Sequence, residues 1–270
     1  MAGQILGDRY KVEKQLGRKS GRWTLLATDI ANETPAILKL ISMDDELHPD
    51  VIRLFDREMS ILKSLNHPAL PQYLDYFEID LPKEMKALVL VQSYIEGISI
   101  DKYLRKGRIF SEKEARNISK AILKILAYLH SHEPCIVHRD IKPSNILLVN
   151  PPDKKSKVCL VDLGSVKQIA SRPSHTTVLS LVGDENYMAP EQLGGRAVLS
   201  SDLYSLGLTV LTLLTGLEPD SLPKKGMSVD VYGVQQCSPE FAQWLSKMIE
   251  PTIQKRFATV DEALNVLQNI

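Results

Sequence analysis

The order of apolar and polar positions predicts a sheet in the first third of the chain. Three strand-length runs separated by turn residues, at 9–16, 24–29 and 35–41, predict a meander of antiparallel strands. Two further strand-like runs follow at 70–78 and 87–95.

Helical periodicity interrupts these strands once and then dominates the rest of the chain. Apolar residues recur every three or four positions over residues 49–65 and again over 111–130, where Ser111 and Glu114 form the signature of a capping box. The longest apolar stretch, 203–217, is interrupted by hydroxyl residues and is too short to span a membrane, so it predicts a buried helix.

Two more helices are expected near the C-terminus, at 239–249 and 259–267. The second begins with Thr259 and Glu262, which predict another capping box. A strand-rich beginning followed by a helix-rich remainder favours the α+β class and two lobes joined by a short linker.

Composition narrows the function classes. Of the 270 residues, 44% are hydrophobic, which is enough for a large core, and 33 basic residues balance 33 acidic ones. This balance gives no electrostatic reason to bind nucleic acid or an anionic membrane surface.

Three cysteines far apart in the sequence, Cys135, Cys159 and Cys237, fit neither a disulfide framework nor a zinc site. With no signal-peptide pattern at the N-terminus, we expect reduced thiols and a cytoplasmic location.

The chemistry is concentrated in residues 138–145, which read H-R-D-I-K-P-S-N between two apolar segments. Asp140 can accept a hydroxyl proton, Lys142 can neutralise a moving phosphoryl group, and Asn145 can ligate Mg²⁺. Seventeen residues after Asn145, Asp162 opens a D-L-G sequence after a hydrophobic strand.

These motifs resemble those of protein kinases. The run at 138–145 is similar to the catalytic-loop motif, D-L-G to the metal-binding D-F-G motif, A-I-L-K at 36–39 to V-A-I-K, and M-A-P-E at 188–191 to the A-P-E element. The resemblance covers the chain from Arg9 to Leu267 in the family's order, and points to the eukaryotic-type serine/threonine kinases of bacteria, with a cyanobacterial character.

The resemblance implies a two-lobed kinase fold. One catalytic domain would span 1–270, with a small antiparallel-sheet lobe and one main helix at about 1–92, a hinge at about 92–97, and a larger helical lobe at about 98–270. It also implies that Asp202 holds the backbone of the catalytic loop and that Arg256 pairs with Glu191.

The implied activity is transfer of the γ-phosphoryl group of ATP to a protein serine or threonine hydroxyl with Mg²⁺, or Mn²⁺ in its place. The implied partner is a protein substrate, and self-association for autophosphorylation is an option; no direct membrane insertion is expected. The implied catalytic residues are Asp140, Lys142, Lys39 and Glu58, and the implied metal ligands are Asn145 and Asp162. The implied ATP-binding residues are Leu16, Gly17, Thr24, Ile37, Lys39, Gln92, Ser93, Tyr94, Ile95 and Leu147.

The glycine-rich loop departs from the family pattern. Of three expected glycines only Gly17 is in register, while Lys19 and Arg22 occupy the other two positions. Either the loop closes differently, with a basic side chain near the phosphates, or nucleotide binding is weakened.

Two other positions also differ. Ile37 replaces the small alanine that in the family rests on adenine, and the sequence leaves open whether the pocket narrows or the strand shifts. Asp184 replaces a threonine that hydrogen-bonds the catalytic aspartate and lysine, so its carboxylate either pairs with Lys142 or repels Asp140. These changes keep a second interpretation open, a pseudokinase or weakly active scaffold that binds partners or nucleotide.

The segment 162–191 is rich in hydroxyl groups. The candidate phosphorylation sites are Ser180, Thr177 and Thr176, and the resemblance places Ser180 where an activating phosphate would bind Arg139.

Overall fold

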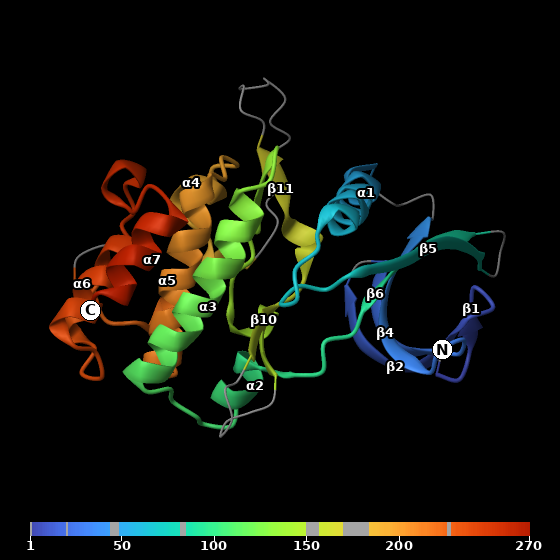
Figure 1. Cartoon of the computed structure of the whole chain (residues 1–270), viewed down its shortest axis with the longest axis horizontal. Coiled ribbons are helices and arrows are strands. Elements are labelled where there is room, and N and C mark those ends of the chain that lie inside the picture. The colour runs from blue at the N-terminus through green and yellow to red at the C-terminus, as the bar shows by residue number, and fades with distance from the viewer. Residues whose placement is uncertain are drawn as a thin grey trace. The chain divides into compact units, whose positions relative to one another are not determined.

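The computed structural model describes residues 2–19, 21–43, 49–81, 85–149, 157–169, 184–225 and 228–270. Its contacts divide the chain into two compact units, Met1–Glu96 and Gly97–Ile270. The first is built on a sheet and the second mainly on helices, which confirms the predicted α+β class (Figure 1).

The first unit contains a six-stranded antiparallel sheet with the order β1-β2-β3-β4-β6-β5 (Figure 1). The meander and the two later strands are confirmed, although several bounds differ from those predicted. The strands are β1 (Ile5–Leu6), β2 (Tyr10–Lys19), β3 (Arg22–Asp29), β4 (Thr34–Met43), β5 (Tyr73–Asp80) and β6 (Lys86–Ser93).

The start of β5 was predicted too early, at residue 70. Pro71 has no N–H for the ladder, and the amide of Leu70 is already bonded to the carbonyl of His67 in a turn. The end of β6 was predicted too late, because the strand ends at Ser93 and not at Ile95.

Successive side chains of a strand point to opposite faces of the sheet, so every second residue can join a hydrophobic core on one face. In β4, Ala36, Leu38 and Leu40 are buried in a cluster with residues of the neighbouring strands. Ile37 and Lys39 therefore point to the opposite face. The helix α1 (Pro49–Ser64) agrees with the predicted amphipathic helix.

The second unit is organised around two long helices that pack on each other, α3 (Glu112–His130) and α5 (Leu199–Thr215). The predicted capping box of α3 is confirmed, since Ser111 Oγ accepts from the Glu114 amide and Glu114 Oε2 accepts from the Ser111 amide. The predicted buried helix is α5, which ends at Gly216 in the left-handed conformation (φ 70°).

Two C-terminal helices complete this unit, α6 (Pro239–Met248) and α7 (Val260–Gln268). They are joined in the core by Trp244, whose Nε1 donates to the carbonyl of Ala263 at 2.8 Å. The second predicted capping box is only half correct. Thr259 caps the Glu262 amide, but the Glu262 carboxylate accepts from the amide of Ala258 instead of the N-cap amide.

Apart from β10, which corresponds to the hydrophobic strand expected before Asp162, the short elements of the second unit were not predicted, because they are too short for a periodic pattern to stand out in the sequence. The remaining strands and helices are β7 (Ile98–Ser99), α2 (Ile100–Leu104), β8 (Cys135–Val137), β9 (Ile146–Val149), β10 (Lys157–Leu160), β11 (Lys167–Ile169), α4 (Pro190–Leu193), β12 (Lys224–Lys225) and β13 (Ser228–Val229). The short 3-10 helices are η1 (Pro143–Asn145), η2 (Leu163–Ser165), η3 (Glu185–Tyr187), η4 (Pro219–Ser221), η5 (Val231–Gly233) and η6 (Ile253–Lys255). Within the described ranges, no helix has both the length and the apolar character needed to cross a membrane.

Candidate active site

In the first unit, the structure brings Lys39 and Glu58 together. Lys39 on β4 places its Nζ 2.5 Å from Oε1 of Glu58 on α1, and their side chains are 15% and 7% exposed. The lysine leaves the sheet on the face opposite the hydrophobic cluster, and α1 supplies the carboxylate. A shielded pair of this kind fixes the direction of a lysine that would otherwise be flexible.

Three of the predicted ATP-binding residues lie in register across the sheet. Gly17 on β2 pairs with Thr24 on β3, which in turn pairs with Lys39 on β4. Leu16, next to Gly17, is largely exposed. The three residues therefore lie in one row across the sheet, with Thr24 between Gly17 and the lysine that would act on phosphates.

The altered glycine-rich segment folds as a tight hairpin that continues β2 and β3. Lys19 pairs with Arg22 across the turn, and Gly21 adopts the left-handed conformation (φ 71°) that glycine tolerates best. Trp23 packs against the hydrophobic cluster of the sheet, with the guanidinium of Arg18 over its ring. A glycine displaced by one position thus still closes the hairpin.

The predicted adenine-side residues lie on β4, β6 and the segment after β6. Ile37 faces Gln92 across the two strands, and both are buried. The hydroxyl of Ser93 accepts from the amide of Gln72, and the amide of Ser93 donates to the carbonyl of Gln72. Tyr94 and Ile95 are half-buried beyond the end of the strand, while Leu147 lies half-buried on β9 of the second unit.

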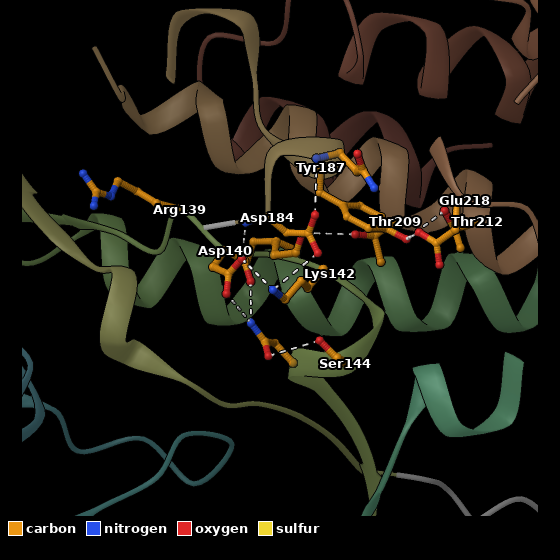
Figure 2. Close-up of polar contacts among 12 residues, drawn as sticks. Arg139, Asp140, Lys142, Ser144, Asp184, Tyr187, Thr209, Thr212 and Glu218 are labelled. Carbon is orange, nitrogen blue, oxygen red and sulfur yellow. Dashed lines mark hydrogen bonds and ion pairs between the residues drawn. The ribbon is translucent and has the colours of Figure 1, made fainter. Parts of the chain in front are cut away.

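In the second unit, the residues predicted to carry catalysis converge on Asp140 (Figure 2). Nδ2 of Asn145 donates to both Oδ2 and the main-chain oxygen of Asp140, at 2.9 and 2.8 Å, and Nζ of Lys142 lies 3.2 Å from Oδ1 of Asp140. The Asp140 side chain is only 7% exposed. A buried carboxylate with a fixed orientation is suited to accept a proton from an acceptor hydroxyl.

Asp184 also belongs to this cluster. Its amide donates to Oδ1 of Asp140 at 3.1 Å, while its own Oδ2 lies 3.6 Å from Nζ of Lys142 (Figure 2). The sequence left pairing with Lys142 and repulsion of Asp140 open. The structure has the ion pair, and the same residue donates a hydrogen bond to Asp140.

Asp202 on α5 holds the backbone of the catalytic loop. Its two carboxylate oxygens accept from the amides of His138 and Arg139 at 2.9 and 2.8 Å, and Nε2 of His130 lies 2.9 Å from its Oδ2. Burial alone would raise the pKa of Asp202, but the contacts with His130 and the loop amides outweigh it and hold that pKa below its ordinary value. The role expected for Asp202 is confirmed.

Further polar groups hold the same loop from other elements. Gln192 donates from Nε2 to the carbonyl of Arg139 at 2.8 Å, and Thr209 donates from its hydroxyl to the carbonyl of Ile141 at 3.3 Å. Arg139 has φ 68°, a strained value for a non-glycine residue, and its Nε donates to the carbonyl of Ser165 at 2.6 Å. The loop is therefore fixed by tertiary contacts rather than by its local sequence.

Sequence reasoning missed His130, Gln192 and Thr209 as anchors of the loop. Thr209 carries a visible signal, since a threonine inside an apolar helical stretch needs a hydrogen-bond partner when it is buried. His130 and Gln192 carry no such signal, because their bonds depend on how distant elements pack.

The candidate metal ligands lie at one end of the β9–β10 pair. The amide of Val161 donates to the carbonyl of Asn145 at 2.9 Å, which sets Asp162 beside Asn145. Because the amide nitrogen of Asn145 faces Asp140, its side-chain oxygen, which accepts from the Ser144 hydroxyl at 3.4 Å, is the atom that could bind a cation, and Asp162 is exposed. In the part of the chain that the structure describes, no three or more His, Cys, Asp or Glu residues form a metal cluster. Two oxygen ligands fit Mg²⁺, which keeps waters and substrate phosphates as further ligands.

Glu191 and Arg256 form a buried pair, as the resemblance implied. Nη1 and Nη2 of Arg256 donate to Oε1 and Oε2 of Glu191 at 2.8 and 3.1 Å, and Ser201 donates to the same carboxylate. Burial would raise the pKa of Glu191, but these donors lower it overall.

The three candidate phosphorylation sites, Ser180, Thr177 and Thr176, lie outside the described residues.

A comparison with known families decides the identity. The family described as "Protein kinase domain" matches residues 10–267. The chain belongs to the protein kinase family. The two-lobed family fold and the resemblance stated from the motifs are thereby confirmed.

Curated relatives come from cyanobacteria and other bacteria. The chain is 32% identical to serine/threonine-protein kinase B of Synechocystis sp. and 33% identical to serine/threonine-protein kinase PknA of Nostoc sp., over 97% and 98% of its length. It is 32% identical over 90% of its length to serine/threonine-protein kinase PrkC of Bacillus subtilis. The matches cover 47%, 48% and 36% of these relatives, so the chain spans at most about half their length.

Proposed function

We propose that this chain is a serine/threonine protein kinase domain that transfers the γ-phosphoryl group of ATP to a protein hydroxyl. The observation that carries the proposal is the arrangement of Lys142 and Asn145 around the buried carboxylate of Asp140. The names of the bacterial relatives support the same activity.

In this proposal, Asp140 orients the acceptor hydroxyl and takes its proton as the new oxygen–phosphorus bond forms and the bond from the γ-phosphorus to the leaving ADP oxygen breaks. Asn145 holds the Asp140 carboxylate in place, and Lys142 neutralises charge on the transferred group. Catalysis then depends mainly on positioning and charge neutralisation, as is typical of phosphoryl transfer.

The same proposal assigns nucleotide-binding roles to residues within each unit. In the first, Lys39, oriented by Glu58, would act on the phosphates, and Ile37, Gln92 and the segment after β6 would contact adenine. In the second, Asn145 and Asp162 would ligate Mg²⁺, or Mn²⁺ in its place. The metal would neutralise the phosphate charge when bound.

We further propose that 1–270 forms one catalytic domain with two lobes, which the division at Glu96 and Gly97 supports. A protein acceptor is favoured because the helices after Asp184, with the Glu191–Arg256 pair, form the half of the fold that small-molecule kinases commonly lack.

Three unpaired cysteines suit a reducing, cytoplasmic location. Autophosphorylation between two copies is a further proposal.

The test is transfer of labelled phosphate from ATP with Mg²⁺, to the chain itself and to a mixture of serine- and threonine-containing peptides. The native chain is compared with Asp140→Asn, which keeps the shape and removes the base. We expect label with the native chain and a loss of at least about 100-fold with the variant. Equal labelling by both would contradict the assignment of Asp140.

A second candidate function is a nucleotide-binding pseudokinase. The ion pair between Lys142 and Asp184 favours it, because this pair engages the ammonium group that would otherwise neutralise the transferred phosphoryl group. Melting temperature with and without Mg·ATP separates binding from turnover, since a ligand of the folded state raises it. A shift without transfer to any acceptor supports the pseudokinase. A shift with transfer supports the kinase.

A further inference from the structure

Asp184 contacts both the base and the lysine of the candidate site, and this inference rests on the proposed function. Three distances define the arrangement: Oδ1 of Asp140 lies 3.2 Å from Nζ of Lys142 and 3.1 Å from the Asp184 amide, and Oδ2 of Asp184 lies 3.6 Å from the same Nζ. The lysine ammonium thus lies between two carboxylates (Figure 2).

The carboxylate of Asp184 is itself held in place. Its Oδ1 accepts from the amide of Asn186 and caps the short helix η3, which leaves Oδ2 directed to Lys142. At 3.6 Å the contact with Lys142 is an ion pair rather than a hydrogen bond, so it depends on charge and not on exact direction.

Lys142 needs such support. Its side chain is 20% exposed, and a lysine with four rotatable carbons has many conformations unless charges restrain it. With Asp140 as its one carboxylate partner, the ammonium would settle on the base. A second carboxylate shares the ammonium and holds it at the edge of Asp140, where one of its three N–H groups can reach a phosphoryl oxygen.

We infer that Asp184 is a positioning residue that sets the place of Lys142 beside Asp140 by charge. Its amide fulfils a separate role on Asp140, which a substitution of Asp184 by asparagine leaves in place. The variant Asp184→Asn therefore isolates the charge, because it keeps the amide, the shape and an oxygen able to cap η3.

The kinetic test compares the native chain, Asp184→Asn, Lys142→Met and the double variant in steady-state assays over a range of Mg·ATP concentrations. The matched control is Glu185→Gln, an exposed carboxylate on the same short helix. We expect Asp184→Asn to lower kcat about tenfold with KM for ATP nearly unchanged, and the control to have little effect. In the Lys142→Met background the same substitution should change kcat less than about twofold.

Three outcomes would overturn the inference. A rise in kcat on Asp184→Asn would mean that the carboxylate keeps the Lys142 ammonium away from the phosphoryl group. A loss that persists in the Lys142→Met background would mean that Asp184 acts through the fold. A change in KM alone would assign it to nucleotide binding.

A second cycle does not depend on activity. The same four proteins are unfolded in urea, and we expect the Asp184–Lys142 coupling to change the unfolding equilibrium constant by roughly two- to fivefold. If the native chain transfers no phosphate, the proposed function fails, and this cycle still decides whether Asp184 holds Lys142. An absence of coupling would refute the inference even for an active kinase.

Discussion

The hairpin at residues 17–24 and the catalytic loop at residues 138–145 would serve the same reaction, but they are held in different ways. The hairpin is held by pairing with its own neighbouring strands, and a Cβ added at Gly17 would meet no atom within 4 Å. The catalytic loop is held by Asp202, Gln192, Thr209 and Asp184, which reach it from distant parts of the sequence. A segment with local support tolerates substitutions that a loop with buried tertiary support does not.

The largest effect is expected when the main anchor of the catalytic loop is removed. Asp202→Ala leaves the amides of His138 and Arg139 without their acceptor in a fully buried site. We expect the free energy of unfolding to fall by about 3 kcal/mol or more, measured by urea denaturation. Asp220→Ala, at an exposed carboxylate, is the control. A loss under about 1 kcal/mol would mean that the loop does not depend on Asp202.

A smaller effect is expected at the buried pair of Glu191 and Arg256. The pKa of Glu191 is lower in the folded chain than its ordinary value of 4.5, so its stabilisation is present above that pH and is lost as pH falls through the folded pKa. Glu191→Gln should lower stability by about 2 kcal/mol at pH 7.

The difference between native and variant should shrink as the pH falls below 4.5. Unfolding curves from pH 7 to pH 3 check this for both proteins. A difference that stays constant over that range would show that the charge of Glu191 does not stabilise the fold.

The smallest effects are expected in the hairpin, where two glycines form a matched pair. Gly21 has φ 71°, so Gly21→Ala should cost about 1 kcal/mol. Gly17 has neither a positive φ nor a close neighbour, and Gly17→Ala should change stability by less than about 0.5 kcal/mol. Thermal unfolding of the two variants compares them directly, and equal losses would contradict the local account of the hairpin.

The same contrast explains what the sequence could predict. Strands such as β4, the helix α3 with its capping box, and the order of the motifs follow from periodicity and local spacing. The consequence of Asp184 could not be predicted, because pairing or repulsion depends on where its amide and Lys142 lie relative to Asp140. His130 and Gln192 were missed for the same reason. The predicted start of β5 at residue 70 was wrong because the apolar run there resembles a strand, while Pro71 has no N–H for the ladder.

Phosphoryl transfer by this chain should depend on the fixed catalytic loop more than on the glycine pattern of the hairpin. The most direct measurement is the single-turnover rate of labelled phosphate transfer for the native chain, Gly17→Ala and Asp140→Asn at saturating Mg·ATP. We expect a rate within about threefold of native for Gly17→Ala and a loss of at least about 100-fold for Asp140→Asn. Similar losses in both variants, or full activity in Asp140→Asn, would contradict it.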